Sequence, residues 1–387
     1  MSHSSNSSPV VILTGAYDDQ YLSLRKDDPC VCTSAGKRLI LYRAIAEATG
    51  TEPLLLSPQP HGRKGSEAQP ERLTEFGTSR QHFAKASGVR KIRVPLNMIH
   101  FARHVARHAP RNATFVLDNY ELVHVLAILY CRLLGKRPRV ILEYEDGKHL
   151  IDRGIFLVLG NLAERLARPL VRGAILAAPA LADRLPAGVP TTLVPGILQP
   201  GVRPAAAPPP GSPVVFIYSG SLDVERGAPL LLDFLESSLV PDNTEFHITG
   251  QGHFVDRFLK LMESRPGQVH FHGCVSQTEL ARIRSLCHFG LNLQSSENPI
   301  SQVTYPSKTF DYMNAGLGVV SSRAARVDEV LGNSAVYLPA ETTCGLAEAI
   351  EAACRGIRQG QDASAKPLVR FSFDGTVNRL RELFAAA

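Results

Sequence analysis

One twelve-residue segment organises the sequence: residues 305–316 read YPSKTFDYMNAG. Pro306 suits the first position of a helix and Gly316 the position just after its end, so the segment predicts a short helix. Lys308 and Asp311 are three residues apart and therefore project from the same side of that helix. A cation in the first turn, beside free backbone N–H groups, suits a phosphate, and the carboxylate suits ribose hydroxyls. The alternative is an amphipathic helix with a solvated ion pair.

The segments on both sides of this helix have the pattern of buried strands. CHFGLNL at 287–293 precedes it and leads into a polar loop, and GVVSS at 318–322 follows it. Strand, loop, helix and strand in this order form a βαβ unit, whose ligands bind at the carboxyl ends of the strands. These residues therefore outline a nucleotide-diphosphate site in a parallel sheet.

Further segments carry a resemblance to a known family. They are FIYSGSL at 216–222 with Arg226 and Gly227 after it, FHITGQG at 246–252, and VHFHGCVS at 269–276. Together with the Asn-Pro loop and the Pro-Ser-Lys helix, they make residues 211–355 resemble the nucleotide-binding half of retaining, glycogen-synthase-like glycosyltransferases of family 4. The Pro-Ser-Lys helix resembles one bacterial subgroup that builds surface polysaccharides.

The resemblance implies an α/β protein of GT-B architecture, with two Rossmann-like doubly wound domains facing across a cleft. Alternating strands and helices in the N-terminal half also predict a mostly parallel sheet. We expect an N-terminal acceptor-side domain at 1–198, a proline-rich linker at 199–213 and a nucleotide-sugar-binding domain at 214–368. In the resembled family the last helix, here within 369–387, crosses back to the N-terminal domain. Packing against its own domain is the alternative.

The same resemblance implies transfer of a sugar, with retention, from a nucleotide-diphosphate sugar to a glycan or lipid-linked acceptor. Such a transfer leaves negative charge on the diphosphate, so cations belong beside it. Arg226 and Lys308 are the expected catalytic residues, although a surface position at a helix start is the alternative for Arg226. The expected donor-binding residues are Gly220, Gly227, Gly250, Asn298, Ser307, Lys308 and Asp311.

The chain departs from the family pattern at three positions. Ser221 stands where a basic residue is usual, Val303 stands where the first glutamate is usual, and the second acidic residue is shortened to Asp311. The alternative function is therefore a non-catalytic nucleotide-sugar-binding member of the family. Release of free nucleotide diphosphate in the presence of an acceptor distinguishes the two.

Candidate acceptor-side residues lie in the N-terminal half. A glycine-containing loop at 33–38 precedes the first predicted helix, and a polar cluster at 143–149 follows a buried strand, although both are also compatible with ordinary loop charges. The candidates are Gly36, Glu145, Asp146 and His149. No Asp-x-Asp pair closes a strand, so we expect no catalytic metal, and no cofactor besides the donor substrate. A Rossmann dehydrogenase is disfavoured because Val255 stands where the third glycine is required.

Composition agrees with a folded protein of two domains. The chain has 387 residues, of which 44% are hydrophobic and 20% charged, and no apolar run approaches the ~18 residues of a membrane span. Its seven scattered cysteines, and a start without the pattern of a signal peptide, predict a cytoplasmic protein with reduced thiols. The net charge is +6, with many basic residues between 90 and 139. Scattered solvated charge or contact with anionic lipid at the inner face of the membrane explains them, whereas nucleic-acid binding is disfavoured by the lack of a recognition motif.

Overall fold

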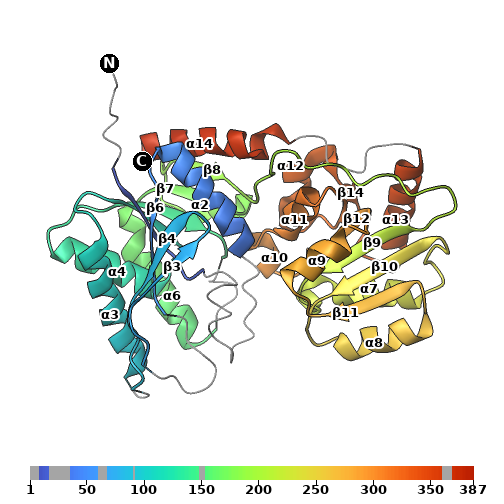
Figure 1. Cartoon of the computed structure of the whole chain (residues 1–387), viewed down its shortest axis with the longest axis horizontal. Helices are drawn as coiled ribbons and strands as arrows, with labels where there is room; N and C mark the ends of the chain where they lie inside the picture. The colour runs from blue at the N-terminus through green and yellow to red at the C-terminus, as the bar shows by residue number, and fades with distance from the viewer. Residues whose placement is uncertain (1–7, 17–34, 60–67, 90–91, 148–152, 360–367) are drawn as a thin grey trace. The chain divides into compact units, whose positions relative to one another are not determined.

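The computed structural model describes six stretches of the chain, and within them the chain forms two compact units (Figure 1). The described residues are 8–16, 35–59, 68–89, 92–147, 153–359 and 368–387. Unit 1 comprises the residues up to 177, 181–194 and 374–387, whereas unit 2 comprises 178–180 and 195–373. The predicted class, two α/β units built on largely parallel sheets, is confirmed. In the described part of the chain, no helix is both long and apolar enough to cross a membrane.

Unit 1 contains an eight-stranded sheet in the order β3-β4-β2-β1-β5-β6-β7-β8. Only the β3–β4 pair is antiparallel. The inner strands are largely apolar and buried, because helices cover both faces of such a sheet. The strands are β1 Val10–Leu13, β2 Leu54–Ser57, β3 Arg72–Phe76, β4 Ser79–Phe83, β5 Thr114–Asp118, β6 Arg139–Tyr144, β7 Val171–Leu176 and β8 Thr191–Leu193.

The last helix of the chain, α14 (Phe373–Ala386), packs on the sheet of unit 1 (Figure 1). A Cβ atom added to Gly173 on β7 would lie 3.1 Å from the Leu383 side chain, so helix and strand are in close contact. Arg379 donates a hydrogen bond of 3.1 Å to the carbonyl oxygen of Leu193 on β8. The other α-helices of this unit are α2 Ala35–Thr49, α3 Arg93–His108, α4 Leu122–Leu133 and α6 Ile155–Ala167.

Unit 2 contains a six-stranded sheet, parallel throughout, in the order β11-β10-β9-β12-β13-β14. One face carries the apolar core, in which the Phe216 ring stacks on Phe246 and Phe289 with centroids 5.3 and 5.5 Å apart. The strands are β9 Val214–Ser219, β10 Thr244–Thr249, β11 Val269–Gly273, β12 Phe289–Asn292, β13 Gly318–Ser321 and β14 Val336–Tyr337. The α-helices are α7 Ala228–Glu236, α8 Val255–Ser264, α9 Gln277–Arg284, α10 Ile300–Val303, α11 Lys308–Asn314, α12 Val327–Leu331 and α13 Thr343–Arg358.

Three boundaries differ from the sequence predictions. Helix α2 begins at Ala35, inside the glycine-containing loop expected at 33–38. Helix α11 begins at Lys308, so Pro306 precedes the helix instead of starting it. Residues 195–198, which we expected to end the N-terminal domain, lie in unit 2. The Asn314 side chain of α11 binds this segment, because it donates to the carbonyl oxygen of Ile197 at 2.9 Å and accepts from the amide of Gln199 at 2.8 Å. The segment 199–213 contains neither helix nor strand.

Candidate functional site

The strand order of unit 2 reverses between β9 and β12, where the chain winds outward in both directions. In open parallel sheets this reversal opens a crevice at the carboxyl ends of the two strands, which is the usual ligand site. The loop that begins at Gly220 follows β9, and the loop that contains Gln294 follows β12. Both loops carry residues that the sequence assigned to the donor site.

Lys308 provides a buried cation at this reversal. Its Nζ atom lies 4.3 Å from the centre of the Tyr218 ring and makes no hydrogen bond with any residue that the structure describes. Burial, together with the nearby Arg226 guanidinium, lowers the pKa of Lys308 from 10.5 to about 7. An ammonium without a hydrogen-bond acceptor is costly to bury, and an anionic ligand would supply the acceptor.

Arg226 is held beside this ammonium by a chain of hydrogen bonds. Its Nη1 donates to Oε1 of the buried Gln294 at 2.6 Å, and Nε2 of Gln294 donates to the carbonyl oxygen of Thr304 at 3.0 Å. The Tyr218 hydroxyl lies 3.0 Å from the Arg226 carbonyl oxygen and so fixes the backbone as well. The structure therefore brings together the two residues predicted to stabilise a diphosphate, on loops from opposite sides of the strand reversal.

Three glycines shape the loops around these cations. Gly220, Gly227 and Gly250 have φ angles of +143°, +80° and +142°, which disfavour other residues. A Cβ atom on Gly227 would overlap the carbonyl oxygen of Leu293, and one on Gly250 would overlap that of Gly220. A Cβ atom on Gly220 would lie 3.9 Å from Nζ of Lys308, so this loop borders the ammonium. The glycines allow backbone to approach closely where the two cations lie.

The remaining predicted donor residues lie on the segments around α11. Asp311 is partly buried on the helix, but Nζ of Lys308 makes no hydrogen bond with it, so the solvated ion pair considered from the sequence does not form. Ser307 is partly buried and immediately precedes α11. Asn298 Oδ1 accepts a hydrogen bond of 3.1 Å from the amide of Ile300, which shapes the loop. Val303 is buried, and at this position the chain presents an apolar side chain to the protein interior.

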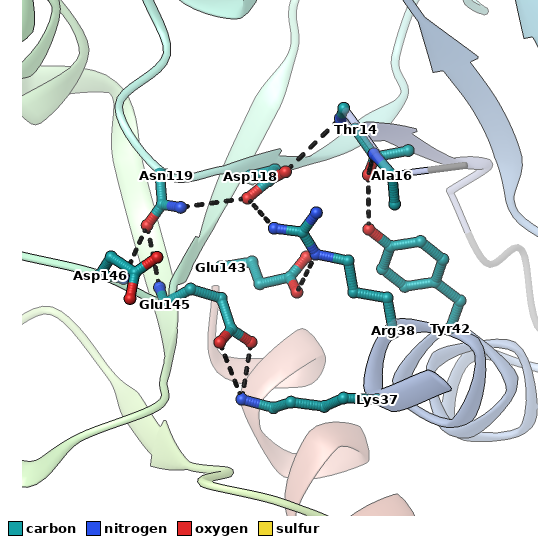
Figure 2. Close-up of polar contacts among 11 residues, drawn as sticks. Thr14, Ala16, Lys37, Arg38, Tyr42, Asp118, Asn119, Glu143, Glu145 and Asp146 are labelled. Carbon is teal, nitrogen blue, oxygen red and sulfur yellow. Dashed lines mark hydrogen bonds and ion pairs between the residues drawn. The ribbon is translucent and has the colours of Figure 1, made fainter. Parts of the chain in front are cut away.

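A second polar cluster lies in unit 1, where α2 meets the carboxyl ends of β5 and β6 (Figure 2). Arg38 donates from Nη2 to Oδ1 of Asp118 at 2.8 Å, and its Nε lies 3.9 Å from Oε1 of Glu143. Lys37 pairs with Glu145 at 2.7 Å. Lys37 and Arg38 at the start of α2 therefore extend to carboxylates that lie on or just after neighbouring strands.

Glu143 is a fully buried carboxyl group in this cluster. Both carboxyl oxygens are buried without a hydrogen-bond partner among the described residues. Burial raises the pKa of Glu143 to about 8, and the charges of Asp118 and Glu145 act in the same direction, against the opposing effect of Arg38. The carboxyl group of Glu143 is therefore largely protonated at neutral pH, which keeps an acid at the strand ends.

Asn119 shapes the turn that carries the predicted acceptor-side carboxylates. Its backbone has a φ angle of +50°, and its Oδ1 accepts hydrogen bonds from the amides of Glu145 at 2.9 Å and Asp146 at 3.1 Å (Figure 2). Gly36 is the second residue of α2, and a Cβ atom there would meet nothing within 4 Å. His149 lies outside the described residues.

Four members of this cluster were not named as individual candidates, although they lie in or next to the polar segments that follow the strands: Arg38, Asp118, Asn119 and Glu143. A signal for two of them was present in the sequence, because Asp118 and Glu143 interrupt or end apolar strands that are adjacent in the sheet. A buried carboxylate on such a strand requires a cation nearby, and Arg38 is that cation.

Comparison with known proteins agrees with the fold. Residues 213–355 match the family model described as "Glycosyl transferases group 1". The Anabaena protein Alr3699/HepE, in complex with UDP, is similar in structure with a TM-score of 0.65 and 12% identity, over 98% of this chain and 100% of that one. The lipopolysaccharide outer core galactosyltransferase WaaB is similar with a TM-score of 0.63 and 12% identity, over 97% and 99% of the two chains.

A third similar structure is an alpha,alpha-trehalose-phosphate synthase (UDP-forming) from Burkholderia vietnamiensis, with a TM-score of 0.63 and 11% identity, over 98% and 99% of the two chains. No curated protein sequence matches this chain. The structural matches cover nearly the whole chain, so the expected GT-B fold is confirmed.

Proposed function

We propose that the protein is a glycosyltransferase that moves a sugar, with retention, from a nucleotide-diphosphate sugar to a glycan or lipid-linked acceptor in surface polysaccharide biosynthesis. The observation that carries this proposal is the buried ammonium of Lys308, which has no hydrogen-bond partner among the described residues and lies beside Arg226 at the strand reversal. A match of residues 213–355 to group 1 glycosyltransferases supports it. So do the structures of HepE, which are complexes with UDP, with UDP and glucose, and with UDP-glucose.

The two cations would stabilise the leaving diphosphate. As the bond to the sugar breaks, negative charge grows on the diphosphate, and preorganised cations in a buried site lower the energy of that state. In the ligand-free protein the pKa of Lys308 is lowered to about 7. A bound diphosphate would raise this pKa, so the ammonium would be charged during the reaction. Gln294 keeps Arg226 in place, and Gly220, Gly227 and Gly250 let backbone approach the phosphates. Asp311 would bind the ribose, while Asn298 and Ser307 would complete the donor site.

The acceptor would bind to the cluster of unit 1. Glu145 and Asp146 are held by Asn119, and Lys37 orients the Glu145 carboxylate, so these groups are preorganised for sugar hydroxyls. A galactosyltransferase of the lipopolysaccharide outer core among the similar structures supports a glycan as acceptor.

Retention follows if no side chain has to act as base. An inverting transfer needs a base opposite the leaving group, whereas in a retaining transfer the departing diphosphate can accept the acceptor proton on the same face. Proton NMR of the new linkage decides the configuration. Inversion, with activity abolished by Asp146→Asn, would overturn the roles proposed for Arg226 and Lys308.

We also propose that unit 1 makes peripheral contact with an anionic membrane from the cytoplasmic side. Helix α6 exposes Ile155, Phe156 and Val158 at 62%, 68% and 61%, and the neighbouring α4 exposes Leu133 at 83%. Exposed basic residues accompany them on and after α3 and α4: Arg103, Arg107, Arg111, Arg132 and Arg137. Apolar side chains beside basic ones suit an anionic lipid surface. Phe156→Ser should reduce co-sedimentation with phosphatidylglycerol vesicles, whereas Leu259→Ser, an exposed leucine of α8, should not.

The alternative, a non-catalytic nucleotide-sugar binder, is favoured by two observations. Val303 is buried, and the Ser221 hydroxyl is hydrogen-bonded to Asp223 instead of being free for a ligand. Thermal-shift screening with UDP, GDP, ADP and their sugars identifies the donor, because a ligand specific to the folded form raises the melting temperature. Release of the nucleotide diphosphate that depends on an acceptor then indicates an enzyme. Binding without release across a broad acceptor panel indicates the alternative.

A further inference from the structure

A cluster of three histidines and one glutamate lies on β10 and β11, at the edge of the unit 2 sheet. Glu245 and His247 are two apart on β10, and His270 and His272 are two apart on the edge strand, so each pair shares a face of the sheet. His247 and His270 are register partners in the parallel ladder. The opposite face of β10 carries Phe246 in the apolar core, so the cluster lies on the other side of the sheet.

The side chains of this cluster point toward one carboxylate oxygen. Oε1 of Glu245 lies 3.0 Å from Nε2 of His247 and 3.0 Å from Nε2 of His270. The two imidazole rings stack with centroids 4.8 Å apart and planes 21° apart, so their Nε2 atoms lie side by side. All three donor atoms lie within 4.8 Å of one another. His247 is 8% exposed, Glu245 25% and His270 36%, so the site is sheltered but open to small ions.

We propose that Glu245, His247 and His270 bind a divalent transition-metal ion, with Zn²⁺ as the expected ion. Two imidazoles and one carboxylate are a donor set that zinc accepts, with a water molecule as fourth ligand. Tetrahedral coordination with bonds of ~2.0–2.2 Å places donor atoms roughly 3.3–3.5 Å apart. The two distances of 3.0 Å need to open by a few tenths of an ångström, and the Nε2 atoms of His247 and His270, which lie within 4.8 Å of each other, need to reach the same range. Metal binding therefore requires rotation of the partly exposed Glu245 and His270 side chains, so that both imidazole lone pairs point to the ion.

His272 is a positioning residue for this site. Its Nε2 lies 2.9 Å from Nδ1 of His247, on the side of the His247 ring away from Glu245. When Nε2 of His247 binds the metal through its lone pair, the ring proton resides on Nδ1 and is donated to His272. Without metal, Nε2–H of His247 donates to Glu245, and Nδ1 accepts a proton from His272. Each arrangement satisfies both nitrogens of His247, and an outer hydrogen bond of this kind fixes the tautomer that metal binding requires.

The metal would join the edge strand β11 to β10 and so stabilise the sheet. A ligand that binds only the folded protein raises its melting temperature. This role does not depend on the proposed glycosyltransferase activity, because Glu245 is near the start of β10 whereas the donor-site glycines follow the ends of the strands.

Zinc titration of chelator-treated protein without a polyhistidine tag tests the proposal. Calorimetry should detect binding of Zn²⁺, and Zn²⁺ should raise the melting temperature. His270→Ala and Glu245→Gln should each weaken binding at least tenfold, and His272→Ala should weaken it ten- to hundredfold. His270→Cys should keep the metal and give its Co²⁺ complex a thiolate-to-cobalt charge-transfer band. This band would be absent if residue 270 did not bind the metal.

A second group, Glu71, His104 and His108 in unit 1, provides the matched control because its donor atoms are also within 4.8 Å of one another. His108→Ala should leave the Zn²⁺ affinity of the β10–β11 site and the Co²⁺ spectrum of His270→Cys unchanged. His270 is partly exposed, so its variants should fold, and the melting temperature of the metal-free variants verifies this. Absence of Zn²⁺ binding by the wild type would overturn the proposal. So would wild-type affinity in His270→Ala, or loss of all binding in His108→Ala.

Discussion

Replacement of Lys308 by methionine should have opposite effects on stability and on ligand binding. Methionine keeps an unbranched apolar chain against the Tyr218 ring but removes the charge. In the ligand-free protein the buried ammonium is a cost, whereas in the complex it is a contact to the diphosphate. We therefore expect Lys308→Met to raise the free energy of unfolding of the ligand-free protein and to weaken the binding of UDP.

The size of the stability effect follows from the pKa of Lys308, which burial lowers from 10.5 to about 7. Between these values the unfolded chain holds a proton that the folded chain lacks, so wild-type stability rises with pH through this window. At about 1.4 kcal/mol per pH unit, the cost of Lys308 is roughly 5 kcal/mol at pH 6 and roughly 2 kcal/mol at pH 9. The free energy of unfolding of Lys308→Met should exceed that of the wild type by up to these amounts, and the difference should be larger at pH 6 than at pH 9.

The binding effect is that of one charge-assisted contact, ~1.5–3 kcal/mol, or about a 10- to 150-fold weaker affinity for UDP. Chemical denaturation at pH 6 and pH 9 measures stability, and calorimetry measures affinity. Calorimetry in buffers of different ionisation enthalpy should also show proton uptake by the wild type above pH 7, because the ligand raises the pKa of Lys308. Lys260→Met, at an exposed position of α8, is the matched control and should change neither quantity. A Lys308→Met protein that is less stable at pH 6, or that binds UDP as tightly as the wild type, would refute this reasoning.

Three further predictions concern a buried acid, a loop glycine and the effect of a chelator. Burial raises the pKa of Glu143 from 4.5 to about 8, so the stability contributed by this carboxyl group is fully present below pH 4.5 and is lost as pH rises through 8. Glu143→Gln should therefore flatten the fall in melting temperature from pH 5 to pH 9, whereas exposed Glu348→Gln should not. Gly227→Ala should abolish nucleotide binding and should lower the melting temperature by more than Gly211→Ala does. Both glycines have φ angles near +80°, but only a Cβ atom on Gly227 would overlap a backbone atom. Equal losses of melting temperature would mean that the strain of the positive φ angle alone matters. Transfer activity should survive EDTA at a temperature well below unfolding, because Arg226 and Lys308 act on the diphosphate; loss of activity that Mg²⁺ restores would contradict this.

The sequence was sufficient for the parts of the fold that are set locally. The buried-strand pattern at 287–293 and the glycine and proline positions around Lys308 predicted a strand and a helix, and β12 and α11 form there. The resemblance placed a strand and a glycine loop at 216–222, and β9 ends at Ser219, just before Gly220. The β3–β4 pair was not predicted, because RLTEF and SRQHF are short and largely polar and become strands only through pairing with each other and with β2. The start of α11 was also misplaced, because Pro306 precedes the helix.

The candidate site was harder to predict where its residues are distant in the chain. The three-residue spacing of Lys308 and Asp311 predicted that Lys308 belongs to the site. The burial of Lys308, however, depends on Tyr218 and on the loop after β9, which are distant in the sequence. Arg38 was interpreted only as part of a glycine-containing loop, since its partners on β5 and β6 come from segments far along the chain. The roles of Arg226, Lys308 and Asp311 in catalysis and donor binding stay predictions.

The position of α14 has a consequence for the order in which the protein folds during synthesis. Unit 2 is almost continuous in sequence, from residue 195 to residue 373. Most of this unit can therefore fold while it leaves the ribosome. The sheet of unit 1 is translated first, yet Gly173 and Leu193 have no helix to pack against until residues 374–387 have been made. Domains usually complete folding in the order of translation. In this protein, unit 1 is translated first but completes its folding last, because it needs residues 374–387. The surface of β7 and β8 that α14 covers therefore stays accessible to chaperones until those residues have been made.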